Sequence, residues 1–305
     1  MKISSNGLQF EVVVDEPTTA SPNPPTVLLT MGLGMQLIAW PDSLVQALCQ
    51  AGYRVVRYDN RDVGLSSHLD DQGLPNMPWQ FVKHKLGFAP THPYTLQDMA
   101  EDAVGLLDAL GVSQAHLVGV SMGGMISQRV AATHPQRVLS LASIMSSSGA
   151  PGLPGPRSDV ARYLLTRPAS LQPADLVAHS MGLIKLIGGT TFADDLEHVR
   201  QRTLEVVQRG VYPAGLMRQT LAAVADTTRH ELLLRITCPT LVIHGTADPL
   251  VPLDCGEDTA RRIPGAQFHA IEGMGHDWPP ALIPVWLQWL LPHLQSASPT
   301  PQTVP

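Results

Sequence analysis

The chain has 305 residues, of which 44% are hydrophobic and 15% are charged, so it can bury a large core and lacks the composition of a disordered protein. Its 20 Lys and Arg residues face 26 Asp and Glu residues, a net charge of −6, and no basic run occurs. This balance argues against binding of a polyanion such as nucleic acid and favours a neutral or weakly polar partner.

Strand and helix patterns alternate along the first half of the chain. Apolar, β-branched stretches predict strands at residues 8–14, 26–31, 53–58, 115–120 and 138–145. Helical spacing of apolar residues predicts helices at residues 42–51, 96–110 and 122–134. Strands separated by helices are typical of a parallel sheet that is covered on both faces.

The alternation stops at a segment rich in Ser, Pro and Gly, residues 146–156. Helical patterns follow at residues 159–165, 175–186, 194–208 and 216–225. The alternation then resumes with strands at 240–244 and 266–271 and helices at 254–263 and 281–291. We therefore predict an α/β core over residues 1–148 and 231–295, with a mostly parallel sheet and a helical cap inserted at 149–230. The last residues, 296–305, have little to bury and predict a disordered tail.

A candidate nucleophile lies between a predicted strand and a predicted helix. The segment Gly119-Val120-Ser121-Met122-Gly123 matches the pattern G-x-S-x-G, in which a strained turn lifts the serine hydroxyl above the sheet edge. Glycines two residues before and after the serine let strand and helix approach each other. The bare pattern occurs by chance in about one chain in eight of this composition, so its position carries the argument. The alternative is a glycine-rich turn with an incidental serine.

A serine nucleophile needs a base, and the base needs a carboxylate that orients it. Asp248 follows the predicted strand 240–244, and His276 lies between the last predicted strand and the last helix. The resulting order Ser, Asp, His is the one that α/β-hydrolases use. A solvated loop carboxylate is the alternative role for Asp248.

Other acids and histidines are weaker candidates because of their positions. The competing carboxylates fall on the helix predicted at 254–263; they are Asp254, Glu257 and Asp258. Three histidines lie within predicted strands, where a buried, hydrogen-bonded core residue is expected; they are His116, His244 and His269.

The oxyanion of an acyl-transfer intermediate needs two backbone N–H donors. Met122 follows the serine at a helix N-terminus and is expected to supply one. Leu33, in Met31-Gly32-Leu33-Gly34 after the strand 26–31, is the candidate for the other. A plain turn after a strand is the alternative for this segment.

Several segments are similar to those of one family. They are Met31-Gly32 with Trp40-Pro41-Asp42, the decapeptide at 57–66, the serine motif at 119–124, and Gly273-Met274-Gly275-His276. Over residues 8–294 the chain resembles the α/β-hydrolase family, and within it the aclacinomycin methylesterase-like branch. The resemblance implies Ser121, Asp248 and His276 as the triad, Leu33 and Met122 as oxyanion donors, and a cap from roughly 149 to 230. The chain departs from most relatives at Met31, where they have His.

These observations predict a serine hydrolase that cleaves a carboxylic ester through an acyl-enzyme, without a cofactor or metal. A carbon–carbon bond hydrolase, a lactonase, a perhydrolase or a ligand-binding protein on the same fold are the alternatives. The decapeptide at 57–66 is interpreted as a structural turn whose polar side chains bind loop backbone. Candidate substrate contacts, each of which also suits an ordinary core position, are Met35, Trp40, Met125, Met145, Met181, Met217 and Trp278.

Location and partners are predicted from what the sequence lacks. The first residues are polar, without the apolar region of a signal peptide, and no apolar run approaches the ~20 residues of a membrane span. Cys49, Cys238 and Cys255 have no Cys-x-x-Cys spacing, so reduced thiols are expected. We predict a cytoplasmic protein with a small-molecule ester substrate, no nucleic acid partner and no membrane span, and the sequence leaves its oligomeric state open.

Overall fold

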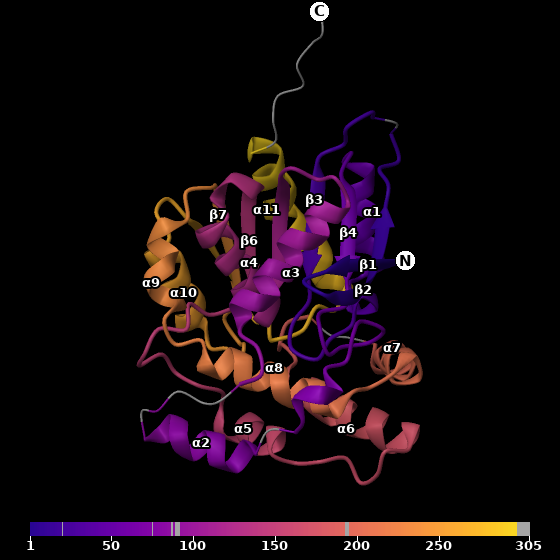
Figure 1. Ribbon diagram of the computed structural model, residues 1–305, viewed down its shortest axis with the longest axis vertical. Coiled ribbons are helices and arrows are strands. Elements are labelled where there is room, and N and C mark those ends of the chain that lie inside the picture. The colour runs from indigo at the N-terminus through magenta and orange to yellow at the C-terminus, as the bar shows by residue number, and fades with distance from the viewer. Residues whose placement is uncertain (20, 75, 87, 89–91, 193–194, 298–305) are drawn as a thin grey trace, which may run out of the picture.

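Eight strands form a single sheet in the part of the chain that the computed structural model describes, residues 1–19, 21–74, 76–86, 88, 92–192 and 195–297 (Figure 1). The strands are β1 (Lys2–Ser5), β2 (Leu8–Asp15), β3 (Thr26–Thr30), β4 (Arg54–Tyr58), β5 (Ala115–Val120), β6 (Val138–Ile144), β7 (Thr240–Gly245) and β8 (Gln267–Ile271). Their spatial order is β1-β2-β4-β3-β5-β6-β7-β8. Only the β1–β2 and β2–β4 pairs of this sheet are antiparallel.

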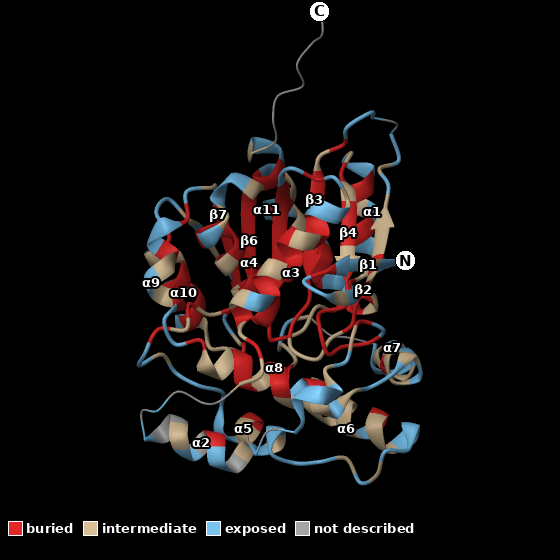
Figure 2. Ribbon diagram, in the orientation of Figure 1, coloured by how far each residue is buried: buried red, intermediate tan, exposed pale blue. Residues whose placement is uncertain are grey.

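The central strands are buried along their whole length because helices cover both faces. Every residue of β3 and β5 is buried, as their continuous apolar sequences predict, and Figure 2 shows β3 in the colour of buried residues. Thr30 pairs with Gly119, and Val120 of β5 pairs with Ile144 of β6. The carboxyl ends of these parallel strands therefore lie along one edge of the sheet, where α/β proteins bind their ligands.

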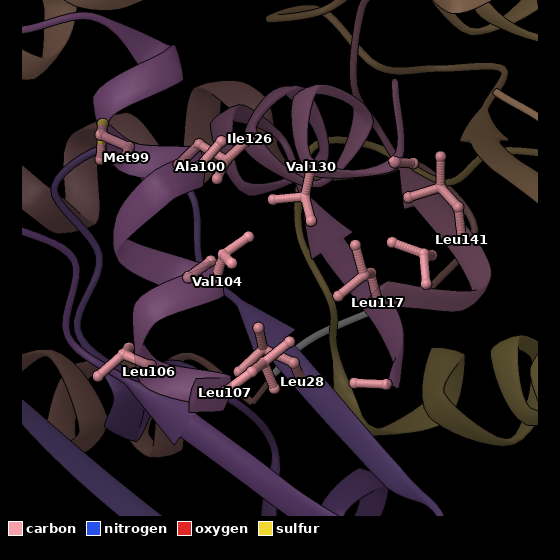
Figure 3. Close-up of a cluster of buried hydrophobic side chains, with 14 of the residues drawn as sticks. Leu28, Met99, Ala100, Val104, Leu106, Leu107, Leu117, Ile126, Val130 and Leu141 are labelled. Atoms are coloured by element: carbon pink, nitrogen blue, oxygen red, sulfur yellow. The ribbon is translucent and has the colours of Figure 1, made fainter. Parts of the chain in front are cut away.

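Successive residues of one strand point to opposite faces of the sheet and enter different cores. Leu28 packs with α3 (Leu96–Ala109) and α4 (Met122–Thr133), and Figure 3 shows it near Val104 and Leu107 of α3. Val27 and Leu29 instead pack with α1 (Asp42–Gln50) and α11 (Ile283–Ala297). The remaining core helix is α10 (Leu253–Arg262), and short 3-10 helices occupy Leu37–Ala39, Asp70–Gln72, Pro135–Arg137, Leu233–Arg235 and Pro280–Leu282. The predicted α/β fold is thus confirmed.

Helices fill the region between β6 and β7, in agreement with the sequence pattern. They are α5 (Ser158–Leu164), α6 (Pro173–Ile187), α7 (Leu196–Arg209), α8 (Pro213–Ala225) and α9 (Arg229–Leu232). Figure 1 shows α5, α6, α7 and α8 as a layer below the sheet, together with α2 (Met77–Lys85). The assignment of residues 149–230 as a separate cap domain stays a prediction.

The structure adds elements that the sequence pattern did not predict. β1 is an edge strand of four mostly polar residues, and α2 lies in a segment for which no helix was expected. α11 continues through Pro292 to Ala297, so Ser296 and Ala297 are helical, whereas the rest of the predicted tail, 298–305, lies outside the described residues. Within the described ranges, no helix has the length and apolar character needed to cross a membrane.

Candidate active site

Ser121 occupies a strained turn between β5 and α4. Its backbone has φ +54° and ψ −123°, a conformation that costs a non-glycine residue about 1–3 kcal/mol. A Cβ at Gly119 would lie 2.2 Å from the Gly123 carbonyl oxygen, so strand and helix approach as closely as the G-x-S-x-G pattern requires. The Ser121 N–H donates to the Ile144 carbonyl at 2.9 Å, which ties the turn to β6. The serine side chain is thereby held at the carboxyl edge of the sheet.

Asp248 and His276 form a hydrogen-bonded pair at the same edge. Asp248 follows β7 and His276 follows β8, and His276 Nδ1 lies 2.7 Å from Asp248 Oδ2. Asp248 Oδ1 accepts N–H groups of Leu250 and Val251 at 2.9 and 2.8 Å. Both side chains are buried, which strengthens the electrostatic interaction between them. These two backbone bonds to Oδ1 orient the Asp248 carboxylate so that Oδ2 faces the His276 imidazole.

The Ser121 hydroxyl forms no hydrogen bond with His276 or with any other described residue, although the Ser146 hydroxyl donates to the Ser121 carbonyl at 2.7 Å. Catalytic hydrogen bonds often shorten only when substrate is bound, so this separation does not remove His276 as the base. Asp248 and His276, the predicted acid and base, are hydrogen-bonded to each other, and Ser121, the predicted nucleophile, lies at the same carboxyl edge of the sheet.

The competing acids, Asp254, Glu257 and Asp258, are either exposed or bound to other side chains. Asp254 and Glu257 are exposed on α10. Asp258 is buried but binds Ser148 Oγ at 2.5 Å and Arg262 Nε at 2.6 Å. Burial alone would raise the pKa of Asp258, and these bonds reverse the effect, so its pKa is lowered. None of these carboxylates forms an ion pair with a histidine among the described residues.

His244 is the buried core residue that its strand position predicted, but it also contacts the acid loop. Its Nε2 lies 2.8 Å from the Val251 carbonyl oxygen and 3.7 Å from Asp248 Oδ2. Burial lowers its pKa, which favours a neutral ring that donates to Val251. His244 therefore braces the loop that carries Asp248, a role that its position within a strand did not indicate.

The other two strand histidines differ from each other. His116 is fully buried and bonds Ser140 Oγ at 2.9 Å, as expected. The expectation of a buried His269 is wrong: it is only partly buried and stacks on Trp289, with ring centroids 3.7 Å apart. The reason is that β8 is an edge strand, which the sequence pattern alone does not reveal.

The two candidate oxyanion donors belong to segments that adjoin Ser121. Met122 is the first residue of α4, and its N–H points from a helix N-terminus. A Cβ at Gly32, the residue before Leu33, would lie 3.1 Å from Ser121 Cβ and 3.6 Å from Ser121 Oγ. Neither the Leu33 nor the Met122 N–H donates a hydrogen bond within the described chain. Both groups therefore retain donor capacity near the serine.

The decapeptide at 57–66 is a turn held by its own side chains, in agreement with its structural interpretation. Asp59 is fully buried and accepts the N–H groups of Leu37 and Leu65 at 2.7 and 2.9 Å. Asn60 Nδ2 donates to the Met31 carbonyl at 3.0 Å. The turn thus supports the loop that holds the Leu33 donor.

The same decapeptide forms ion pairs with two helices of the predicted cap. Arg209 of α7 lies 2.7 Å from Asp59 Oδ2. Arg218 of α8 makes two bonds to Asp62, at 2.8 and 2.9 Å. Burial alone would raise the pKa of Asp62, but its bonds to Arg218 and to the Leu69 N–H lower it overall. Sequence reasoning did not assign these arginines a role, since only the fold brings them to the turn.

The candidate substrate contacts fall into two groups. Trp40 and Met145 are fully buried in the core that includes α1 and α11. Partly buried candidates are Met35, Met125, Met181, Met217 and Trp278. The Thr203 hydroxyl lies 3.8 Å from Met181 Sδ, and Trp278 Nε1 donates to the Ala39 carbonyl at 3.1 Å. Which of them touch substrate stays a prediction.

Comparisons with known proteins agree with this architecture. Two curated relatives are rhodomycin D methylesterases, from Streptomyces sp. (strain C5) at 31% identity and from Streptomyces peucetius at 30%, each covering 84% of this chain and 86% of the relative. They confirm the resemblance to the methylesterase branch and the expected enzyme class, the carboxylic ester hydrolases.

A solved structure and a family model support the same fold. The enol-lactonase from Burkholderia xenovorans LB400 has a TM-score of 0.70 and 23% identity and covers 97% of this chain and 100% of its own; at this identity it shows the fold alone. A family model described as alpha/beta hydrolase fold matches residues 25–278. With its mixed sheet, strained serine turn and His–Asp pair at the carboxyl edge, the chain belongs to the α/β-hydrolase family.

Proposed function

We propose that the protein is a serine esterase with Ser121 as nucleophile, His276 as general base and Asp248 as the orienting acid. The observation that carries the proposal is the bond of 2.7 Å between His276 Nδ1 and Asp248 at the sheet edge where the strained turn holds Ser121. A nucleophilic serine, a histidine and an oriented carboxylate are the parts that acyl transfer requires.

The proposed reaction begins with attack of Ser121 Oγ on the ester carbonyl while His276 Nε2 takes the hydroxyl proton. Asp248 accepts the Nδ1–H of the ring, which keeps Nε2 available as the base and stabilises the imidazolium. His276 then gives the proton to the leaving alcohol. A water molecule, activated by the same histidine, hydrolyses the acyl-enzyme and releases the acid.

Two backbone N–H groups are proposed to bind the oxyanion of each tetrahedral intermediate. Met122 contributes from the N-terminus of α4, where the helix dipole favours negative charge, and Leu33 contributes from the loop after β3. Their lack of other acceptors among the described residues supports this assignment. Each such donor is worth about 10²- to 10³-fold in kcat.

The proposed substrate class is an ester of a small alcohol, since both curated relatives described above are named methylesterases. The helices between β6 and β7 are proposed to form a cap that selects the acyl group, with Met181 and Met217 as contacts. Each pocket methylene changes selectivity by only about 1–3 kcal/mol, so the cap is expected to rank substrates. The cytoplasmic location stays a prediction from the sequence.

The test is turnover of p-nitrophenyl acetate by the wild-type protein and by Ser121→Ala and His276→Ala. Because the triad acts as a unit, each variant is expected to lose about 10⁴- to 10⁶-fold in kcat while remaining folded. Retained turnover in Ser121→Ala would refute the mechanism. A panel of methyl esters, phenyl esters, lactones and a vinylogous diketone, compared by kcat/KM, then separates the esterase from a lactonase and from a carbon–carbon bond hydrolase.

A further inference from the structure

We propose that Gln219, on helix α8, is a positioning residue that fixes the oxyanion loop through its side-chain amide. This inference rests on the proposed function, because it assigns Leu33 N–H as an oxyanion donor. It also implies that a helix of the predicted cap takes part in transition-state stabilisation as well as in substrate selection.

Gln219 is fully buried, and both ends of its amide bind main chain of the core. Its Oε1 accepts the Gly34 N–H at 2.9 Å, and its Nε2 donates to the Arg61 carbonyl at 2.8 Å. The amide thus connects the loop after β3 with the decapeptide turn at 57–66. A buried amide that lost these partners would keep its polar atoms desolvated and unbonded, so the arrangement is strongly preferred.

The contact at Gly34 determines the orientation of one particular peptide unit. The Met35 N–H donates to the Gly32 carbonyl at 3.2 Å, and Gly34 has φ +68°, the pattern of a turn with a positive φ at its third residue. The peptide between Leu33 and Gly34 is the central unit of that turn. Because Gln219 holds the N–H of this unit, the unit cannot rotate without breaking a buried hydrogen bond.

The neighbouring peptide unit carries the proposed donor. The Leu33 N–H belongs to the peptide between Gly32 and Leu33, and Gly32 lies against Ser121. Asn60 fixes Met31, the residue before Gly32, by donating to its carbonyl. Leu216 of α8 packs over Gly34, and a Cβ at Gly34 would lie 2.8 Å from Leu216 Cδ1. The donor is therefore held from the decapeptide on one side and from α8 on the other.

This geometry has a consequence that appears only in the transition state. The oxyanion forms after attack by the serine, so a donor that is held in place stabilises the tetrahedral state more than the bound ester. Loss of the Gln219 amide leaves the Leu33 N–H in the chain but lets the turn move. The expected effect is a lower kcat with little change in KM.

The experiment compares Gln219→Met, which keeps the side-chain length and removes the amide, with Gln219→Glu, which keeps an acceptor for Gly34. Thr220→Val is the matched control, because among the described residues its hydroxyl bonds only the Leu216 carbonyl of its own helix. Turnover of p-nitrophenyl butyrate gives kcat and KM. Inhibition by an alkyl trifluoromethyl ketone, whose hemiketal oxygen occupies the oxyanion position, gives Ki.

We expect Gln219→Met to lower kcat by about 10- to 100-fold, less than the loss of a complete donor, with KM within about threefold. The Ki of the ketone should rise by a similar factor. Gln219→Glu should recover part of the lost kcat, and Thr220→Val should have wild-type kcat and Ki. If Gln219→Met does not fold, Gln219→Asn, too short to reach both partners, takes its place.

A folded Gln219→Met variant with wild-type Ki overturns the inference, whether or not its kcat changes, because the oxyanion site is then unaffected. Ser121→Ala is measured in parallel. If Ser121→Ala retains turnover, the proposed function itself fails; if it is inactive and Gln219→Met is not impaired, only the role of Gln219 is rejected.

Discussion

Asp248 differs from the other acids of its region in what its carboxylate contacts. Both of its oxygens accept hydrogen bonds, from the backbone on one side and from His276 on the other. Asp254, six residues later, lies in the first turn of α10 with an exposed side chain. These surroundings make the two acids a matched pair for testing which one serves the histidine.

Asp248→Asn is expected to lower kcat by about 10⁴-fold, because an amide can donate to Nδ1 and so favours the wrong tautomer of His276. Asp254→Asn should leave kcat within about twofold of wild type. Both are measured as turnover of p-nitrophenyl acetate, with circular dichroism as the check on folding. If Asp254→Asn were the damaging change, the assignment of the acid would be wrong.

The loop that carries His276 is bound to the end of α6. The His276 N–H donates to the Ile187 carbonyl at 2.8 Å, and Asp277 Oδ1 accepts the Gly189 N–H at 3.1 Å. The Thr190 N–H also donates to the Gly273 carbonyl, at 2.8 Å. A segment of the predicted cap therefore holds the main chain of the proposed base, and catalysis should depend on that contact.

Asp277→Ala removes one of these bonds and should lower kcat by about 10- to 100-fold, since a shift of about 1 Å in a catalytic group costs up to 100-fold. KM should change less, because the substrate pocket keeps its side chains. The control is Glu272→Ala, an exposed carboxylate on the same loop. Equal kcat values for the two variants would show that the Asp277 contact does not position His276.

α8 is joined to the core by the buried pair of Arg218 and Asp62, which are 1% and 0% exposed. Two parallel hydrogen bonds and a further bond from Arg218 to the Gly73 carbonyl, at 2.8 Å, satisfy the guanidinium. Removal of one partner from a buried pair leaves the other charged and desolvated. The pair is therefore more sensitive to substitution than an exposed one.

Arg218→Met is expected to lower the free energy of unfolding by about 3–5 kcal/mol, because Asp62 would remain buried without its partner. Arg157→Met, which breaks the exposed pair with Asp159, should lower the free energy of unfolding far less, because water screens that pair. Urea denaturation followed by tryptophan fluorescence measures both. Similar losses in the two variants would contradict the proposed importance of the buried pair.

The stability of the whole protein should depend on pH through two buried histidines. Burial lowers the pKa of His116 to about 4, with a further contribution from the nearby His293. Burial also lowers the pKa of His293 to about 4, although its bond to the Leu141 carbonyl acts in the opposite direction. Both rings are therefore neutral in the folded protein under conditions in which exposed imidazoles begin to take up protons.

Between about pH 6.5 and pH 4 the unfolded chain binds protons at these two sites that the folded protein does not bind. The free energy of unfolding should therefore fall by up to about 1.4 kcal/mol per pH unit for each histidine as the pH is lowered through this range. Urea denaturation at a series of pH values measures the slope.

His293→Gln removes one of the two proton sites and should make the slope shallower. His198→Gln is the control, since this side chain of α7 is exposed in the folded protein. A slope that is unchanged in His293→Gln would show that this histidine does not link protonation to stability.

The fold could be predicted from the sequence, and the proposed triad located in it, because their signals are local. Periods of apolar residues indicate each strand and helix, and a parallel sheet then places the ends of its strands on one edge. Ser121 follows its predicted strand directly, and Asp248 and His276 lie in the loops after theirs, so their placement at this edge needs only the strand order of the family.

The supporting contacts depended on the tertiary structure. Gln219 and Gly34 are 185 positions apart in the chain, Asp62 and Arg218 are 156 apart, and Gly189 and Asp277 are 88 apart. No spacing rule connects such residues, because their contact depends on how the helices after β6 pack onto loops that follow other strands. The sequence pattern likewise predicted a buried His269, because it does not show that β8 lies at the edge of the sheet. A repeating pattern reports which face of an element is buried, whereas the partner of a buried polar group is set by packing between elements distant in sequence.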